Sequence, residues 1–89
     1  MTTVCFLIQG RVQGVGFRAS ARRKALQLGL TGSARNLNDG RVEVIVQGVS
    51  VAIEAMALWL ERGPAHARVD AVQRTERGAQ PPLYDFEVA

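Results

Sequence analysis

Apolar residues recur along this chain with two different periods, and the order in which those periods alternate limits the folds the chain can adopt. Helical spacing occurs twice, over residues 17–28 and 50–62, where apolar side chains repeat every three or four positions. Strand-like patterns precede, separate and follow these two segments. They cover residues 4–9, 31–36, 41–47, 67–75 and 84–88. The predicted order of elements is therefore β-α-β-β-α-β, with one additional strand.

This order predicts an α+β domain of the ferredoxin-like kind, a split βαβ sandwich in which two helices cover one face of a mainly antiparallel sheet of four to five strands. Val42, Val44 and Val46 alternate onto one face, as expected when helices cover only that face. The nearly continuous apolar run at 4–9 is typical of a central strand. With 89 residues the chain has room for a single domain, residues 1–89.

Capping and turn residues predict where the elements begin and end. Ser50 is expected to cap the second helix at its N-terminus. Asp39-Gly40 predicts a tight hairpin between the second and third strands. Residues 76–82 are predicted to form a loop before the last strand.

The segment between the first strand and the first helix is rich in glycine. It reads Gly10-Arg11-Val12-Gln13-Gly14-Val15-Gly16-Phe17-Arg18. Glycines allow turns in which successive N–H groups point into one concavity, a shape that binds anions. The helix that follows adds free N–H groups and the positive end of its dipole, and Arg18 adds a cation at the rim. The segment therefore predicts a phosphate-binding loop. It consists of Gln13, Gly14, Val15, Gly16, Phe17 and Arg18.

The split βαβ topology is expected to bring the end of the second strand to this loop. The first and second strands run in the same direction, so the loop after the first and the residues that end the second share one edge of the sheet. Asn36 is the last residue before the predicted hairpin turn. We therefore expect Asn36 to face the loop and Arg18, although they are far apart in sequence.

Nucleotide and nucleic-acid sites share parts of this pattern. Residues 14–19 match the dinucleotide fingerprint G-x-G-x-x-A, but a Rossmann sheet needs more chain than 89 residues, and no Gly-Lys-Ser/Thr completes a P-loop. RNA-recognition modules share the order of elements, and a net charge of +3 suits an anionic partner. Their base-stacking aromatic residues are missing from residues 41–47, so no nucleic-acid partner is predicted.

The chain offers few groups for catalysis near the loop. Cys5 is its only cysteine and His66 its only histidine, so neither a metal site nor a cofactor is predicted, and Cys5 is expected in the core. Phosphoryl transfer can be catalysed by positioning and charge stabilisation alone. Without a general acid the leaving group must depart unaided, which a carboxylate, with a conjugate acid of pKa about 4, does and an alkoxide does not. The predicted substrate is therefore an acyl phosphate, a small molecule.

The chain lacks the features of a membrane or secreted protein. No stretch approaches the roughly 18 apolar residues of a membrane span. The N-terminus has no basic region and reaches Gln9 too soon for the apolar part of a secretory signal. We expect a cytoplasmic monomer that does not bind membranes.

The glycine-rich segment resembles the signature of acylphosphatases, and residues 32–40, Gly-Ser-Ala-Arg-Asn-Leu-Asn-Asp-Gly, resemble the second motif of that family. The resemblance spans nearly the whole chain and implies the ferredoxin-like fold and the metal-free hydrolysis of acyl phosphates to a carboxylate and phosphate. Further matching segments are Gln47-Gly48, Trp59-Leu60, Gly63-Pro64 and Ala67-Arg68-Val69-Asp70.

The resemblance also implies roles for two side chains. Arg18 matches the arginine that binds the phosphoryl group together with the loop amides, and Asn36 matches the asparagine that positions the attacking water, whose proton passes to a phosphate oxygen. The chain departs from the family pattern at Ser33 and Ala34, where bulky residues are common, and at Asn38, where proline is frequent. These departures concern packing and turn rigidity. The alternative function is a non-catalytic phosphate-binding or regulatory module of the same fold.

Overall fold

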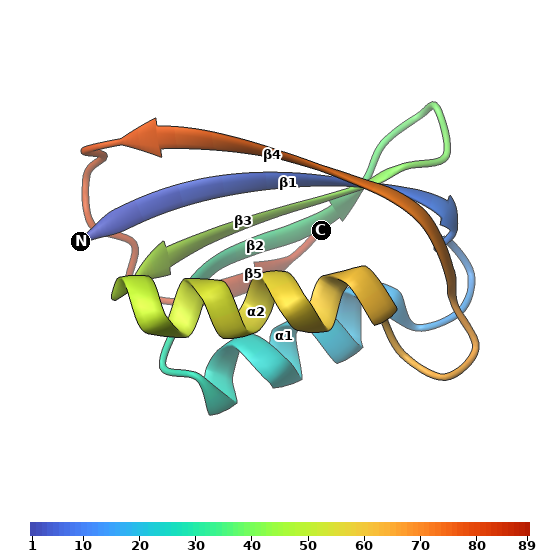
Figure 1. Cartoon of the computed structure of the whole chain (residues 1–89), viewed down its shortest axis with the longest axis horizontal. Helices are drawn as coiled ribbons and strands as arrows, with labels where there is room; N and C mark the ends of the chain where they lie inside the picture. The colour runs from blue at the N-terminus through green and yellow to red at the C-terminus, as the bar shows by residue number, and fades with distance from the viewer.

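Five strands form one sheet, and two helices lie against one of its faces (Figure 1). The computed structural model describes residues 1–89. Neither helix combines the length and the apolar character that crossing a bilayer requires. In chain order the elements are β1 (Thr2–Arg11), α1 (Phe17–Gln27), β2 (Thr31–Asn36), β3 (Val42–Gly48), α2 (Ser50–Arg62), β4 (Arg68–Gly78) and β5 (Phe86–Val88).

The strands lie in the order β4-β1-β3-β2-β5, which places β1 inside the sheet. Strand β3 is antiparallel to both of its neighbours, β1 and β2, so these two run in the same direction. Strand β4 is antiparallel to β1, whereas β5 is parallel to β2. The predicted α+β sandwich with a mainly antiparallel sheet is confirmed, as is the central position of the first strand.

The core lies between the helices and the face of the sheet that they cover. Val42, Val44 and Val46 are fully buried there, as their alternation predicts. The ring of Phe17 from α1 packs against Trp59 from α2, with the ring centroids 6.0 Å apart. Burial of one apolar stripe from each helix holds both helices on this face. The buried helical residues are Phe17, Ala21 and Ala25 of α1 and Ala52, Ile53, Met56 and Leu60 of α2.

The bounds of the two edge strands, β4 and β5, differ from the predicted ones. The loop prediction for residues 76–82 was wrong at its start, because Thr3 and Val4 of β1 pair with β4 as far as Gly78. Strand β1 is correspondingly longer than the predicted run at 4–9. Strand β5 begins at Phe86 because its pairing with β2 starts there.

The prediction that Ser50 caps α2 was also wrong. Ser50 is already helical, and the N-cap is Val49, whose backbone is extended with φ −79° and ψ 150°. The carbonyl oxygen of Val49 accepts hydrogen bonds of 3.1 Å from the N–H groups of Ala52 and Ile53. The backbone alone therefore starts this helix, without a side-chain cap.

The connection between β4 and β5 passes from one edge of the sheet to the other, and a buried glutamine anchors it midway. Gln47 Nε2 donates hydrogen bonds to Thr3 Oγ1 at 3.0 Å and to the carbonyl oxygen of Pro81 at 3.1 Å. Gln47 Oε1 accepts one from the N–H of Leu83 at 2.7 Å. These bonds satisfy a carboxamide that is only 2% exposed, and they guide the chain toward β5.

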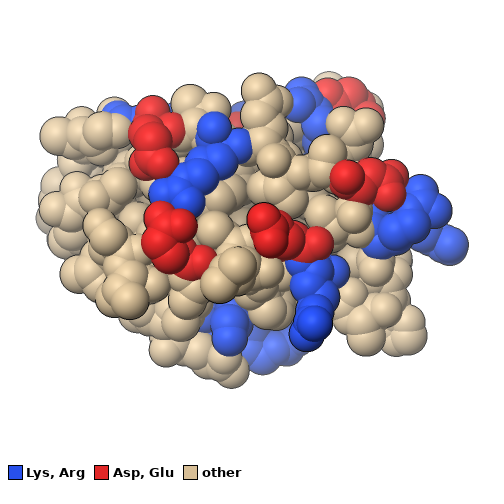
Figure 2. Space-filling model, in the orientation of Figure 1, with Lys and Arg blue, Asp and Glu red and all other residues tan.

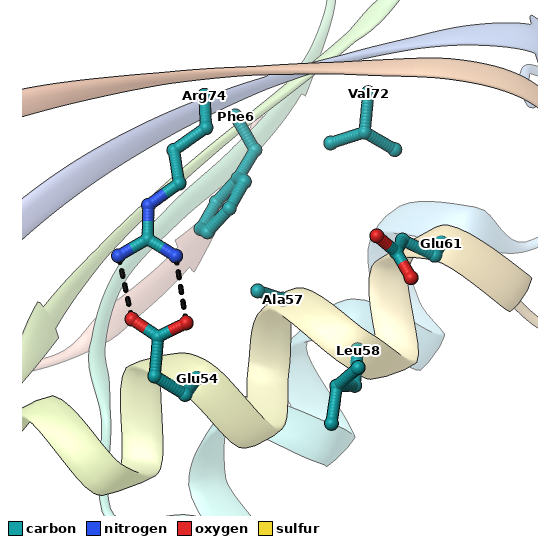
Figure 3. Close-up of a pocket in the computed structure, with 7 residues that line it drawn as sticks. All are labelled: Phe6, Glu54, Ala57, Leu58, Glu61, Val72 and Arg74. Carbon is teal, nitrogen blue, oxygen red and sulfur yellow. Dashed lines mark hydrogen bonds and ion pairs between the residues drawn. The ribbon is translucent and has the colours of Figure 1, made fainter.

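A charged pair joins α2 to the edge strand β4 beside a shallow groove (Figure 3). Arg74 donates hydrogen bonds of 2.9 and 2.7 Å to the two carboxylate oxygens of Glu54, and its guanidinium carbon lies 5.7 Å from the ring centre of Phe6. Hydrogen bonding from Arg74 lowers the pKa of Glu54, and the bond to Glu54 raises the pKa of Arg74. The pair thus connects the helix layer to a strand with only one neighbour.

Candidate active site

A hollow of about 150 Å³ lies where the glycine-rich loop meets the ends of β2 and β5. The topology accounts for this meeting, because β1 and β2 both pair with β3 and run in the same direction. The loop that follows β1 and the last residue of β2 consequently lie at one edge of the sheet. The hollow is lined by Val12, Gly14, Gly16, Phe17, Arg18, Ala19, Asn36 and Val88.

Two glycines shape the loop side of the hollow. Gly14 and Gly16 both have φ of +76°, a left-handed conformation that favours glycine. Gly16 is the N-cap of α1, so the helix begins at Phe17, directly at the hollow. The first N–H groups of a helix have no intrahelical partner, and the helix dipole is positive at this end. This wall of the hollow therefore favours an anion.

Gln13 and Val15, both predicted in the phosphate-binding loop, do not line the hollow. The Gln13 side chain turns toward the β2–β3 hairpin, where Nε2 donates hydrogen bonds of 2.8 Å to the carbonyl oxygen of Leu37 and 3.0 Å to that of Arg41. Val15 is partly buried and packs against the core. These two residues connect the loop to its surroundings, while Gly14, Gly16 and Arg18 face the hollow.

Asn36 and Arg18 line the hollow from different elements. Asn36 is the last residue of β2, pairs with Val42 across the sheet, and is exposed. Arg18 lies in the first turn of α1 and forms no ion pair with an aspartate or glutamate side chain. The hollow thus combines a carboxamide with a guanidinium whose charge no acidic side chain balances.

Strand β5 also reaches the hollow, which the sequence did not predict. Arg18 Nη1 donates a hydrogen bond to the backbone oxygen of Ala89, and Arg22 Nε donates one of 3.2 Å to that of Phe86. The N–H of Ala89 donates to the carbonyl oxygen of Ala34 in β2 at 3.0 Å. Val88 pairs with Ala34 of β2 and borders the hollow. The short alternating run at the end of the chain gives no signal of this contact, which depends on long-range pairing.

The lining supplies hydrogen-bond donors and positive charge, but no histidine, cysteine or carboxylate. His66 is exposed in the connection after α2. Cys5 is buried in β1, where burial raises the pKa of its thiol. No group of three or more His, Cys, Asp or Glu residues is placed to hold a metal ion. What the hollow can do is bind an anion and orient a water molecule beside it.

Acylphosphatases match this chain in the family model, in sequence and in structure. The acylphosphatase family model matches residues 4–88. The acylphosphatase of Alkalilimnicola ehrlichii is 56% identical over 77 residues, 86% of each chain, and that of Nitrosococcus oceani is 52% identical over 88 residues, 99% of this chain and 98% of the other. The crystal structure of acylphosphatase from Bacillus subtilis superposes with a TM-score of 0.96 at 29% identity, covering 100% of this chain and 99% of that one.

Proposed function

This chain belongs to the acylphosphatase family, enzymes that hydrolyse acyl phosphates, and we propose that the glycine-rich loop and Arg18 hold the phosphoryl group while Asn36 positions the attacking water. The observation that carries this proposal is the hollow of about 150 Å³, since Gly14, Gly16, Arg18 and Asn36 all line it. Its size and its donors suit one phosphoryl group with a water molecule beside it.

The proposed reaction is attack of water on phosphorus. The new bond joins the water oxygen to phosphorus, and the bond between phosphorus and the acyl oxygen breaks with its electron pair on the departing carboxylate. The proton of the water passes to a phosphate oxygen, so the products are a carboxylate and phosphate. Because a carboxylate is a weak base, with a conjugate acid of pKa about 4, its departure needs no general acid.

Each proposed group has a separate task. The amides at the start of α1 and the guanidinium of Arg18 stabilise the negative charge on the phosphoryl oxygens, which is the main demand of a loose transition state. The Asn36 carboxamide can accept a hydrogen bond from the water and donate one to a phosphoryl oxygen, which aligns the nucleophile without removing its proton. Gln13 keeps the loop close to Asn36 through its bonds to the hairpin.

An assay of benzoyl phosphate hydrolysis in the presence of a metal chelator tests the proposal. We expect turnover well above the background rate, with phosphate acting as a competitive inhibitor. Phosphate binding without turnover would instead identify a non-catalytic anion-binding module. Absence of both would overturn the assignment of the hollow as a phosphate site.

We also infer that the chain acts as a monomer on a small molecule and does not recognise RNA. The strands that carry base-stacking residues in RNA-recognition modules contain one aromatic side chain here, Phe6, and its ring packs in the core under Arg74. Light scattering is expected to give the mass of a single chain, 9.6 kDa. An RNA titration at moderate salt is expected to show no sequence-dependent binding, and a preferred sequence would contradict this inference.

A further inference from the structure

A second hollow adjoins the first along the outer side of α1. Its volume is about 640 Å³, and it shares Ala19 and Val88 with the phosphate hollow. We call it the α1 groove. It is lined by Ala19, Arg22, Arg23, Leu26, Gln27 and Val88.

The α1 groove has an apolar floor that is open to solvent. Leu26 is 46% exposed and Val88 is 43% exposed, although both are apolar. Ala19, Arg23 and Leu26 lie on one side of the helix because they are spaced four and three residues apart. The groove therefore begins at the phosphate hollow and follows this side of α1 away from it.

Two arginines border this floor without a carboxylate partner. Arg22 donates a hydrogen bond from Nε to the backbone oxygen of Phe86, and Arg23 donates a long one of 3.4 Å to Ser20 Oγ. Helix α1 contains no acidic residue, and none lines the groove. Figure 2 shows basic side chains gathered along the lower edge of the molecule, where α1 lies, while the acidic ones lie over α2 and the strands. In contrast, four other arginines of the chain form ion pairs. These are Arg35, Arg41, Arg68 and Arg74.

We propose that the α1 groove holds the acyl part of the substrate and that Arg23 favours acyl phosphates whose acyl group carries a second negative charge at its far end. This rests on the proposed function, because it requires the phosphoryl group to lie at Arg18. Arg18 and Arg23 are five residues apart on one helix, which places them about 7.5 Å apart along its axis and about 140° apart around it. The preferred acyl group is thus short, apolar in its middle and anionic at its end.

Two rigid substrates test this inference directly. 4-Carboxybenzoyl phosphate and 4-methylbenzoyl phosphate have the same ring and nearly the same length, and they differ in the charge at the far end. We expect the native enzyme to have the higher kcat/KM for the carboxylate. Arg23→Gln should lower the ratio of kcat/KM for the carboxylate to kcat/KM for the methyl compound by about 3- to 5-fold, the size of an exposed ion pair.

Lys24→Gln is the matched control, because Lys24 lies on the same helix but borders a different hollow, next to Trp59 and Arg62. It removes the same charge and is expected to change the ratio of the two kcat/KM values little. An equal effect of Lys24→Gln and Arg23→Gln would mean long-range attraction and would overturn the inference, as would an unchanged ratio in Arg23→Gln. Failure to hydrolyse benzoyl phosphate at all would contradict the proposed function instead.

Discussion

The side-chain amide of Gln13 donates a 2.8 Å hydrogen bond to the carbonyl oxygen of Leu37, the residue that directly follows Asn36. A second bond from the same nitrogen reaches the carbonyl of Arg41 on the other side of the hairpin. One side chain therefore links the glycine-rich loop to both sides of the turn between β2 and β3. The distance between the loop amides and Asn36 therefore depends on these two hydrogen bonds as well as on the pairing of the strands.

Gln13→Met is expected to keep the fold and reduce catalysis. Both carbonyls keep another donor, from the N–H of Gly40 at 3.2 Å for Leu37 and from the N–H of Leu37 at 2.8 Å for Arg41, so the free energy of unfolding should fall by only about 1–2 kcal/mol. Since a displacement of about 1 Å can cost about 100-fold in rate, kcat should fall by about 10-fold or more. Gln73→Met, on the exposed face of β4, is the control. Unchanged kcat in Gln13→Met would exclude a positioning role.

Asn36→Ala is expected to lower kcat by about 100-fold or more while the inhibition constant of phosphate changes little. The reason is that the proposed role of Asn36 concerns the water and the transition state rather than the bound phosphate. The comparison variant is Asn38→Ala, which removes an exposed carboxamide two residues away that does not line the hollow. An equal loss in phosphate affinity and kcat would reassign Asn36 to phosphate binding.

Arg18→Ala is expected to weaken phosphate inhibition by about 10- to 100-fold, as for the loss of a charged hydrogen-bond donor. Arg18→Lys retains the charge but not the forked geometry, so its inhibition constant should lie between those of the native enzyme and Arg18→Ala. Arg11 precedes the loop and does not line the hollow, and Arg11→Ala should bind phosphate almost normally. Normal phosphate inhibition in Arg18→Ala would count against Arg18 as the ligand.

The Glu54–Arg74 pair should make stability depend on pH. Hydrogen bonding from Arg74 holds the pKa of Glu54 below its usual 4.5, so the pair stabilises the folded state above that pH and its contribution disappears as the pH falls through the lowered value. Glu54→Gln should therefore unfold at a lower temperature than the native protein at pH 7, and this difference should shrink as the pH falls below 4.5. The difference at neutral pH should be small because the pair is exposed to solvent.

Glu61→Gln serves as the control for this measurement. Glu61 lies on the same helix beside the same groove but pairs with no arginine. Its substitution should leave the difference in unfolding temperature independent of pH. If the difference in unfolding temperature between Glu54→Gln and the native protein also did not change with pH, Arg74 would not stabilise the ionised carboxylate.

Most of the fold could be predicted because local patterns encode it. The two helical stripes and the alternation of Val42, Val44 and Val46 each specify a buried face within a few residues. The element ends were less predictable, since Gly78 belongs to β4 only through its pairing with Thr3, far away in sequence. A polar, exposed edge strand carries almost no periodic signal of its own.

The sequence by itself determined the order of the elements, the covered face of the sheet and a glycine-rich loop suited to an anion. The predicted topology already placed Asn36 beside that loop, whereas only the tertiary structure decided the other side chains around it. It turns Gln13 away toward the hairpin, brings Val88 to the rim, and leaves Arg23 unpaired beside an apolar groove. The physical reason is that a periodic pattern shows only which face of a helix or strand is buried. The contacts around the loop, in contrast, join segments that meet only after the whole sheet has assembled.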